Sequence, residues 1–307
     1  MSDHRVPLLA SAMALGAGAV WSFGAISARL ADDADAFQYL IWRSIGIIVV
    51  VEVLGRLQGK PPQVIRAYTS GRLMMTANVM LLLASIGFVY AVKTTSAANA
   101  AFFASTTPVF GVLLARIVLH ERLSRLTIAS VALAFTGLVI MVAGDLGAGS
   151  MVGNMSALAC AAGFAGYAVC VRSDPTEDWS PVLPGYAVMM IAICAVTTLA
   201  NGKTLVPPAD DVALALVHGA VFIVVGTILF NVSSRQVPAG AMTVLAQTEM
   251  VLVPLWSFIV LDERPKATTL FGGSIILVAI IGKAVIDARG PAVQPTQQPA
   301  EALEHIL

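Results

Sequence analysis

Residues 102–140 read FFASTTPVFGVLLARIVLHERLSRLTIASVALAFTGLVI, and residues 244–282 read VLAQTEMVLVPLWSFIVLDERPKATTLFGGSIILVAIIG. Each stretch is an apolar run, followed by a short Leu-x-Glu-Arg segment and a second apolar run. The two stretches align without gaps, so that Glu121 falls on Glu263. This shared order indicates an internal repeat. The alternative is a chance match between two apolar segments.

A shorter echo extends the repeat toward the start of each half. The segment WSFGAISAR, which ends at Arg29, is similar to FAGYAVCVR, which ends at Arg172. We therefore expect two related halves, residues 1–146 and residues 147–289.

The composition indicates a membrane protein. Of the 307 residues, 58% are hydrophobic and 12% are charged, and the mean hydropathy is +0.85. This apolar content exceeds what the core of a soluble domain needs. The formal net charge is zero and the charges lie in short clusters between apolar runs, which excludes a nucleic-acid-binding protein.

A window of about 19 residues finds about ten apolar runs that are long enough to cross a bilayer. Because these runs are continuously apolar and do not alternate, they predict helices and not barrel strands. The expected fold class is an all-α integral membrane protein. The predicted spans are residues 8–29, 36–54, 72–93, 96–117, 124–143, 151–172, 181–200, 212–234, 239–261 and 268–287.

Each half then holds about five spans, an odd number, so we expect the second half to lie upside down relative to the first. Inverted repeats of this kind are typical of secondary transporters. These proteins hold the substrate near the middle of the membrane and expose it to each side in turn.

The lysines and arginines predict the orientation, because loops rich in these residues stay on the cytoplasmic side. With the N-terminus inside, most of them fall inside, and those expected outside are Arg29, Lys93, Lys203, Arg264 and Lys266. We expect a multi-pass protein of the cell (inner) membrane with both termini in the cytoplasm. Residues 290–307, rich in Pro, Gln and Ala and without an apolar run, are predicted to form a disordered cytoplasmic tail.

No motif for catalysis, metal or cofactor binding is found in the sequence. Cys160, Cys170 and Cys194 lie in apolar stretches and form no C-x-x-C pair. His120 opens a His-Glu pair, but Ser124 stands where a zinc motif needs its second histidine. We expect neither an enzyme nor a bound cofactor or metal.

The stretches at 105–140 and 247–282 resemble the paired repeat signature of the EamA family in the drug/metabolite transporter superfamily. The segment AVWSFGAISARL at 19–30 resembles the opening span of that family, and YLIWRSIGI at 39–47 carries its intramembrane arginine. The resemblance covers about residues 8–287. It implies ten helices around a central cavity and transport of metabolites such as amino acids, or of drugs. Export is the expected direction.

Two ionisable residues lie deep within predicted spans. Arg43 lies about 10 Å below the outer face, and Glu249 lies about 15 Å above the inner face, at 1.5 Å per helical residue. A charge at this depth costs at least ~2.5 kcal/mol unless it has a partner, water or a function. We expect both to face a substrate cavity, with coupling to protons at Glu249. The alternative is a buried structural salt bridge.

Other residues at similar depth offer aromatic walls, hydrogen-bonding groups or helix kinks. Aromatic residues also gather at lipid interfaces, and prolines within spans also serve packing, so both alternatives stay open. The substrate-binding candidates are Trp21, Trp42, Tyr90, Asn99, Gln247, Thr248 and Trp256, and the hinge or cavity-shaping candidates are Pro108 and Pro254.

The sequence therefore favours a secondary transporter with a small-molecule substrate and the lipid bilayer as its partners. A membrane-embedded enzyme and a channel-like membrane protein remain the alternatives. The chain is expected to act as a monomer or a homodimer.

Overall fold

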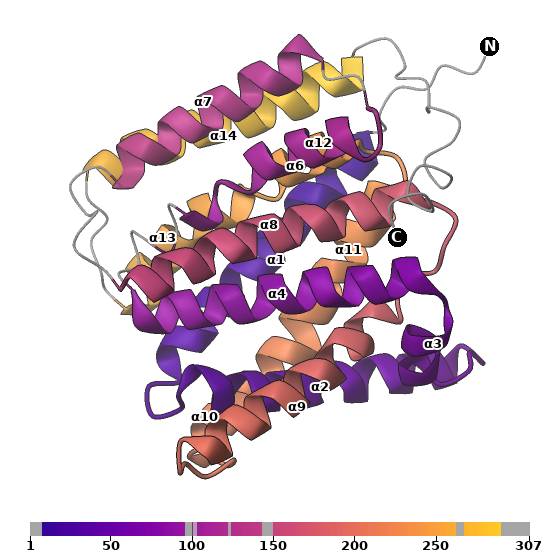
Figure 1. Cartoon of the computed structure of the whole chain (residues 1–307). Coiled ribbons are helices and arrows are strands. Elements are labelled where there is room, and N and C mark those ends of the chain that lie inside the picture. Colours follow the sequence, from indigo (N-terminus) through magenta and orange to yellow (C-terminus); the bar gives the residue numbers. More distant parts are fainter. Residues whose placement is uncertain are drawn as a thin grey trace.

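The computed structural model of the chain describes residues 8–95, 100, 103–121, 124–142, 150–261 and 267–289, and these residues form helices without any strand (Figure 1). Residues 290–307 lie outside this range, so the predicted tail is not described. In the first half the helices are α1 (Leu8–Leu30), α2 (Ala36–Leu57), α3 (Gln63–Thr69), α4 (Arg72–Thr94), α6 (Thr107–Ile117) and α7 (Arg125–Val142). In the second half they are α8 (Met151–Ser173), α9 (Val182–Ala200), α10 (Ala209–Val217), the π-helical η1 (His218–Ile223), α11 (Val224–Ser234), α12 (Ala239–Leu245), α13 (Thr248–Leu261) and α14 (Ala267–Arg289).

These helices follow the apolar runs of the sequence. Within the described ranges, six helical stretches are long and apolar enough to cross a membrane, and three shorter apolar helices, at 107–117, 125–140 and 270–283, accompany them. The all-helical class is thus confirmed.

The sequence did not predict the short helix α3 or the interruptions inside two spans. Ser105 and Thr106 form a turn before α6, and Ala246 and Gln247 form a turn between α12 and α13. The two turns occupy nearly equivalent places in the repeat. Pro108 lies in the first turn of α6, where its missing N–H leaves no helical hydrogen bond unmade.

A third irregularity is η1, a π-helical insertion between α10 and α11. It packs very closely on α2, because a Cβ atom at Gly219 would lie 1.9 Å from the backbone oxygen of Arg43. Only glycine permits this approach of the two backbones.

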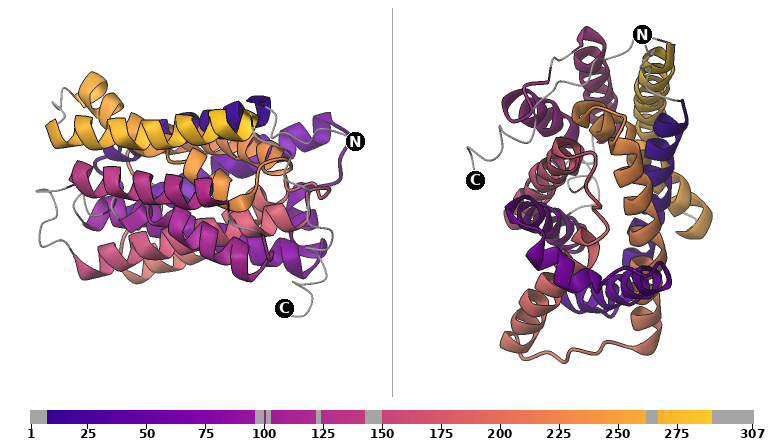
Figure 2. Two further views of the ribbon diagram at one scale, coloured as in Figure 1. Left: turned by 90° about the horizontal axis from the view of Figure 1, so that it is seen from above. Right: turned by 90° about the vertical axis from the view of Figure 1, so that its right-hand side faces the viewer.

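The helices pack in pairs that join the two halves. α4 packs along α8 and α1 packs along α11, while α2 pairs with α9 at one edge and α7 pairs with α14 at the opposite edge (Figure 1). Seen end-on, α4 and α8 form one wall and α1 and α11 form the facing wall (Figure 2).

Aromatic side chains fill part of the space between these walls. The Trp21 ring meets the edge of Phe164 at 5.3 Å and lies 5.5 Å from Phe230, and Phe230 stacks on Tyr167 at 5.8 Å. The Tyr167 hydroxyl donates to Asn231 Oδ1 at 2.5 Å, which satisfies a buried polar group. This cluster joins α1, α8 and α11 beside the central space.

Candidate functional site

A cavity of about 130 Å³ lies between the two walls. By the same measure a single water needs ~10–15 Å³, so the space holds several waters or a small ligand. Both halves contribute to its lining. The polar lining residues are Arg43, Ser85, Thr107, His218, Thr227, Thr243, Gln247 and Glu249, and the aromatic ones are Trp21, Phe88, Phe164 and Tyr186.

Arg43 stands in the middle of α2 and is only 2% exposed. One of its terminal nitrogens donates to the Ser85 hydroxyl on α4. Its Nε has no hydrogen-bond partner within the described part of the chain. A buried N–H group without a partner is costly, so the hydrogen-bonding capacity of this guanidinium, beside the cavity that Arg43 lines, is not fully used.

Glu249 lies in the first turn of α13, directly after the turn at Ala246 and Gln247. The N-terminal end of a helix favours a negative charge. The carboxylate makes no hydrogen bond or ion pair with any residue that the structure describes, and its side chain is partly exposed where it lines the cavity. A carboxylate on the cavity lining without such a partner is available to a ligand there.

Arg43 and Glu249 do not form an ion pair with each other. Both line the same cavity, yet they are absent from the ion pairs that join described residues. Among the described residues, neither charge thus takes part in the buried salt bridge that was the alternative explanation for them.

His218 was not predicted from the sequence. Its Nδ1 lies 2.7 Å from the Tyr39 hydroxyl, and it enters the cavity from the first residue of η1. Gly24 on α1 makes room for the ring, since a Cβ atom there would lie 2.3 Å from His218 Nε2. The available signal was an ionisable residue inside an apolar run, which in a membrane protein indicates a functional position.

Of the other predicted residues, Trp21 and Gln247 line the cavity and several lie elsewhere. The Trp42 indole donates to the backbone oxygen of Leu205 at 3.1 Å, and the Tyr90 ring lies 5.7 Å from Phe37.

The remaining five candidates are not among the residues that line the cavity. The Thr248 hydroxyl donates to the Leu245 oxygen at 2.8 Å, and the Trp256 indole donates to the Ser22 hydroxyl at 2.7 Å. Pro108 lines a separate cavity of about 10 Å³. Pro254 falls within α13, and Asn99 lies outside the described residues.

Within the described ranges, no group of three or more His, Cys, Asp or Glu residues is placed to hold a metal ion. What the cavity does provide is an arginine, a carboxylate and an imidazole around a partly aromatic space. Such a set can bind a small molecule that carries both charged and apolar parts.

Comparisons with known proteins agree with this architecture. A family model described as the EamA-like transporter family matches residues 8–143 and again residues 151–283. One solved structure, described as "Crystal structure of protein", is 18% identical to this sequence. The match covers 91% of this chain and 98% of the chain in that structure, with a TM-score of 0.72. This likeness shows a shared fold. No curated protein matches the sequence.

Proposed function

The chain belongs to the EamA-like transporter family, and we propose that it is a secondary transporter that exposes one central site alternately to the two sides of the membrane. As a member of this family it is a multi-pass membrane transporter of the drug/metabolite type with two repeats. The proposal adds a mechanism, a site and a class of substrate.

The observation that carries the proposal is the cavity with Arg43 and Glu249 on its lining and no ion pair between them. Two opposite charges that leave each other unpaired fit a substrate that brings both a carboxylate and an ammonium group. Amino acids and related amphipathic compounds have this chemistry, and the aromatic walls suit an apolar side chain. The proposed substrate class is therefore small zwitterionic metabolites, with drugs as the alternative cargo and export as the direction.

The helix pairing supports ten spans arranged as a 5+5 inverted repeat. In an internal repeat, α1 corresponds to α8 and α4 corresponds to α11. Exchanging the two halves then replaces the contact between α4 and α8 by a contact between α11 and α1, and the structure has both contacts. The α2–α9 and α7–α14 pairs turn into themselves under the same exchange. A two-fold axis accounts for this pattern, and an odd number of spans in each half would place that axis in the membrane plane. The proposed mechanism is alternating access by one half moving against the other, as in other transporters with inverted repeats.

Glu249 is the proposed coupling residue. A carboxyl group within the membrane interior can exchange a proton or a cationic group of the substrate as its surroundings change between the two open states. The lysine and arginine distribution supports a cell-membrane protein with both termini in the cytoplasm.

The test is counterflow in vesicles that contain the purified protein. Vesicles loaded with one unlabelled amino acid are diluted into the same amino acid carrying a radioactive label, and a panel of amino acids is surveyed. A carrier gives a transient accumulation of label above equilibrium, since it exchanges inside for outside substrate. A channel gives equilibration without this overshoot, and an enzyme gives a chemically altered compound, so either result would contradict the proposal.

A further inference from the structure

Each of the two ends of the α2–α9 pair carries an ion pair between a lysine and an aspartate. At one end, Lys60 Nζ donates to Asp178 Oδ2 at 2.8 Å, and at the other end, Lys203 Nζ donates to Asp35 Oδ2 at 2.9 Å. In each pair the lysine comes from one half and the aspartate from the other. Because α2 has 22 residues, the two pairs lie about 33 Å apart, on opposite faces of the helix bundle.

The register that aligns Arg29 with Arg172 also aligns Asp35 with Asp178 and Lys60 with Lys203. The two ion pairs are thus one element of the repeat, present twice. We call them the Lys60 latch (Lys60 with Asp178) and the Lys203 latch (Lys203 with Asp35).

The lysines stand on matching helix ends. α2 is followed by Gln58-Gly59-Lys60 and α9 by Asn201-Gly202-Lys203, with φ of 69° at Gly59 and 68° at Gly202. The Lys60 N–H donates to Gly55 and the Lys203 N–H to Thr198, each the sixth-to-first bond of a glycine-terminated helix. The same backbone turn therefore aims both lysines across the boundary between the halves.

The aspartates also match atom by atom. Oδ1 of Asp35 accepts from the N–H of Phe37, and Oδ1 of Asp178 accepts from the N–H of Ser180, each two residues later, while Oδ2 accepts from the lysine. Burial raises the pKa of each carboxyl group, but the backbone and lysine hydrogen bonds outweigh it and hold the pKa below its usual range. Both groups are charged at neutral pH.

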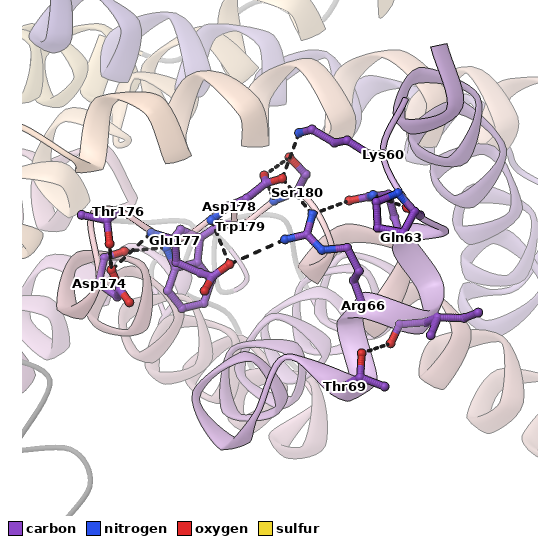
Figure 3. Close-up of polar contacts among 12 residues, drawn as sticks. Lys60, Gln63, Arg66, Thr69, Asp174, Thr176, Glu177, Asp178, Trp179 and Ser180 are labelled. Atoms are coloured by element: carbon purple, nitrogen blue, oxygen red, sulfur yellow. Dashed lines mark hydrogen bonds and ion pairs between the residues drawn. The ribbon is translucent and has the colours of Figure 1, made fainter. Parts of the chain in front are cut away.

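Each latch has reinforcements at its own end. Figure 3 shows Arg66 of α3 reaching the turn that contains Asp178, with Arg66 Nη1 donating to Asp178 Oδ2 at 2.9 Å. At the other end, Gln38 Nε2 donates to the Thr204 oxygen at 2.7 Å. Both latches are closed in this structure.

The helices that the latches join also border the cavity, α2 through Arg43 and α9 through Tyr186. From this placement we infer that the two latches are equivalent gates, each controlling access to the central cavity from its own face of the membrane. The inference rests on the proposed alternating access. Opening toward one face then requires only the latch at that face to part, while its counterpart holds the other end of α2 and α9 together.

A native thiol tests the gates without any substrate. Cys160 lines the cavity, whereas Cys170 and Cys194 are buried elsewhere. In a Cys170→Ala/Cys194→Ala background, a membrane-impermeant methanethiosulfonate applied to intact cells or to inverted vesicles reports access to Cys160 from each side separately. Only the lysine side is altered, because the aspartates also order their own turns.

Lys203→Met opens one latch, and Lys60→Met with Arg66→Met opens the other. The ion pairs are partly exposed, so each variant is expected to raise the Cys160 labelling rate by about two- to fivefold. The rise appears on opposite sides of the membrane for the two variants. Lys203→Arg restores the original rate, and Gln58→Ala and Asn201→Ala, which alter the same turns without touching a latch, leave it unchanged.

Three results would overturn the inference. Labelling could rise on the same side of the membrane for both variants, it could rise on both sides for one variant, or it could rise no more than in the control variants. Should a methionine variant fail to fold, Lys203→Gln, or Lys60→Gln with Arg66→Gln, replaces it, because the amide removes the charge and leaves the aspartate turn intact. The same one-sided rise in labelling is expected, and unchanged labelling again refutes the gate. If labelling contradicts the gates, the proposed transport can still be supported by counterflow. If labelling responds to the latch variants but no counterflow is found, only the proposed transport is refuted.

Discussion

At the scale of single residues, the charged groups in the cavity and those at the helix ends differ in their hydrogen-bond and ion-pair partners. Glu249 faces the cavity without an ion-pair partner among the described residues, whereas Asp178 accepts hydrogen bonds from Lys60, Arg66 and Ser180. A group without partners stabilises the fold little and is available to a ligand. A group with several partners stabilises the contact it makes.

Replacing Glu249 by Gln is therefore expected to leave the protein folded and to abolish counterflow or its pH dependence. The amide keeps the size of the side chain but can neither carry the charge nor exchange the proton. Elution volume and thermal unfolding report folding, and counterflow across pH reports transport. Thr248→Val is the matched control, because its hydroxyl bonds the Leu245 oxygen and lies off the cavity. A folded Glu249→Gln protein with unaltered counterflow at every pH contradicts the assigned role.

Replacing Asp178 by Asn is expected to lower the thermal stability at neutral pH. The folded-state pKa of Asp178 lies well below its usual value, so its stabilisation is present above the unfolded pKa of about 4 and is lost as the pH falls below it. The gap in melting temperature between the wild type and Asp178→Asn should thus be constant near neutrality and narrow in acid. Asp210→Asn, at an exposed position in the first turn of α10, serves as the control. A gap that widens in acid would contradict this assignment.

At the scale of helices, the sequence predicted where the spans lie but not where they break. A continuous apolar run of about 20 residues predicts a span because the bilayer sets that length. The turns at Ser105-Thr106 and Ala246-Gln247 leave no mark on such a run, since Ser, Thr, Ala and Gln all occur within helices. α3 was missed because seven residues between two spans carry too little periodicity.

Rotation about the helix axis explains why only some site candidates reach the cavity. Neighbouring residues on a helix point about 100° apart, so the presence of Arg43 and Glu249 on the lining does not bring Trp42 or Thr248 to it. Depth was readable from the sequence, which placed Arg43, Glu249, Trp21 and Gln247 at suitable levels. Direction was not, because spans that are apolar on every side show no preferred face.

The contact between η1 and α2 gives a prediction at this scale. Gly219→Ala is expected to destabilise the protein by about 1–3 kcal/mol, because the added methyl group would overlap the backbone oxygen of Arg43 and force the two segments apart. Gly282→Ala on α14 is the matched control, as its Cβ would meet no atom within 4 Å. That substitution should be neutral or stabilise by up to ~1 kcal/mol. Thermal unfolding of both variants measures the two changes in stability. Equal changes would show that η1 moves away from α2 at no cost and would contradict the prediction.

At the scale of the whole molecule, the repeat predicted more than the composition did. Composition indicated only a membrane protein, whereas the aligned stretches predicted an internal repeat, and the family match over residues 8–143 and 151–283 confirms a two-repeat architecture. The central cavity between the halves depends on how helices from both of them assemble. No single stretch of sequence encodes that assembly, so His218 and the latch partners became visible only in the structure.

The orientation of the whole chain is testable by cysteine labelling from outside intact cells. In a cysteine-free background, Asn201→Cys is expected to react with an impermeant maleimide and Gln58→Cys is not. The reason is that the Gln58 turn follows the arginine-rich end of α2, which belongs in the cytoplasm. Both positions are exposed in equivalent turns, so each controls for the other. The reverse pattern would invert the proposed orientation.

The matching of the two latches has a consequence for the origin of the molecule. One half contains both a lysine and an aspartate of the required geometry, but never pairs them with each other. Two identical copies of such a half, inserted in opposite directions, would satisfy both ion pairs in an isologous homodimer. Duplication and fusion of one short gene would then yield this chain with its two latches already in place, and each copy could afterwards change independently.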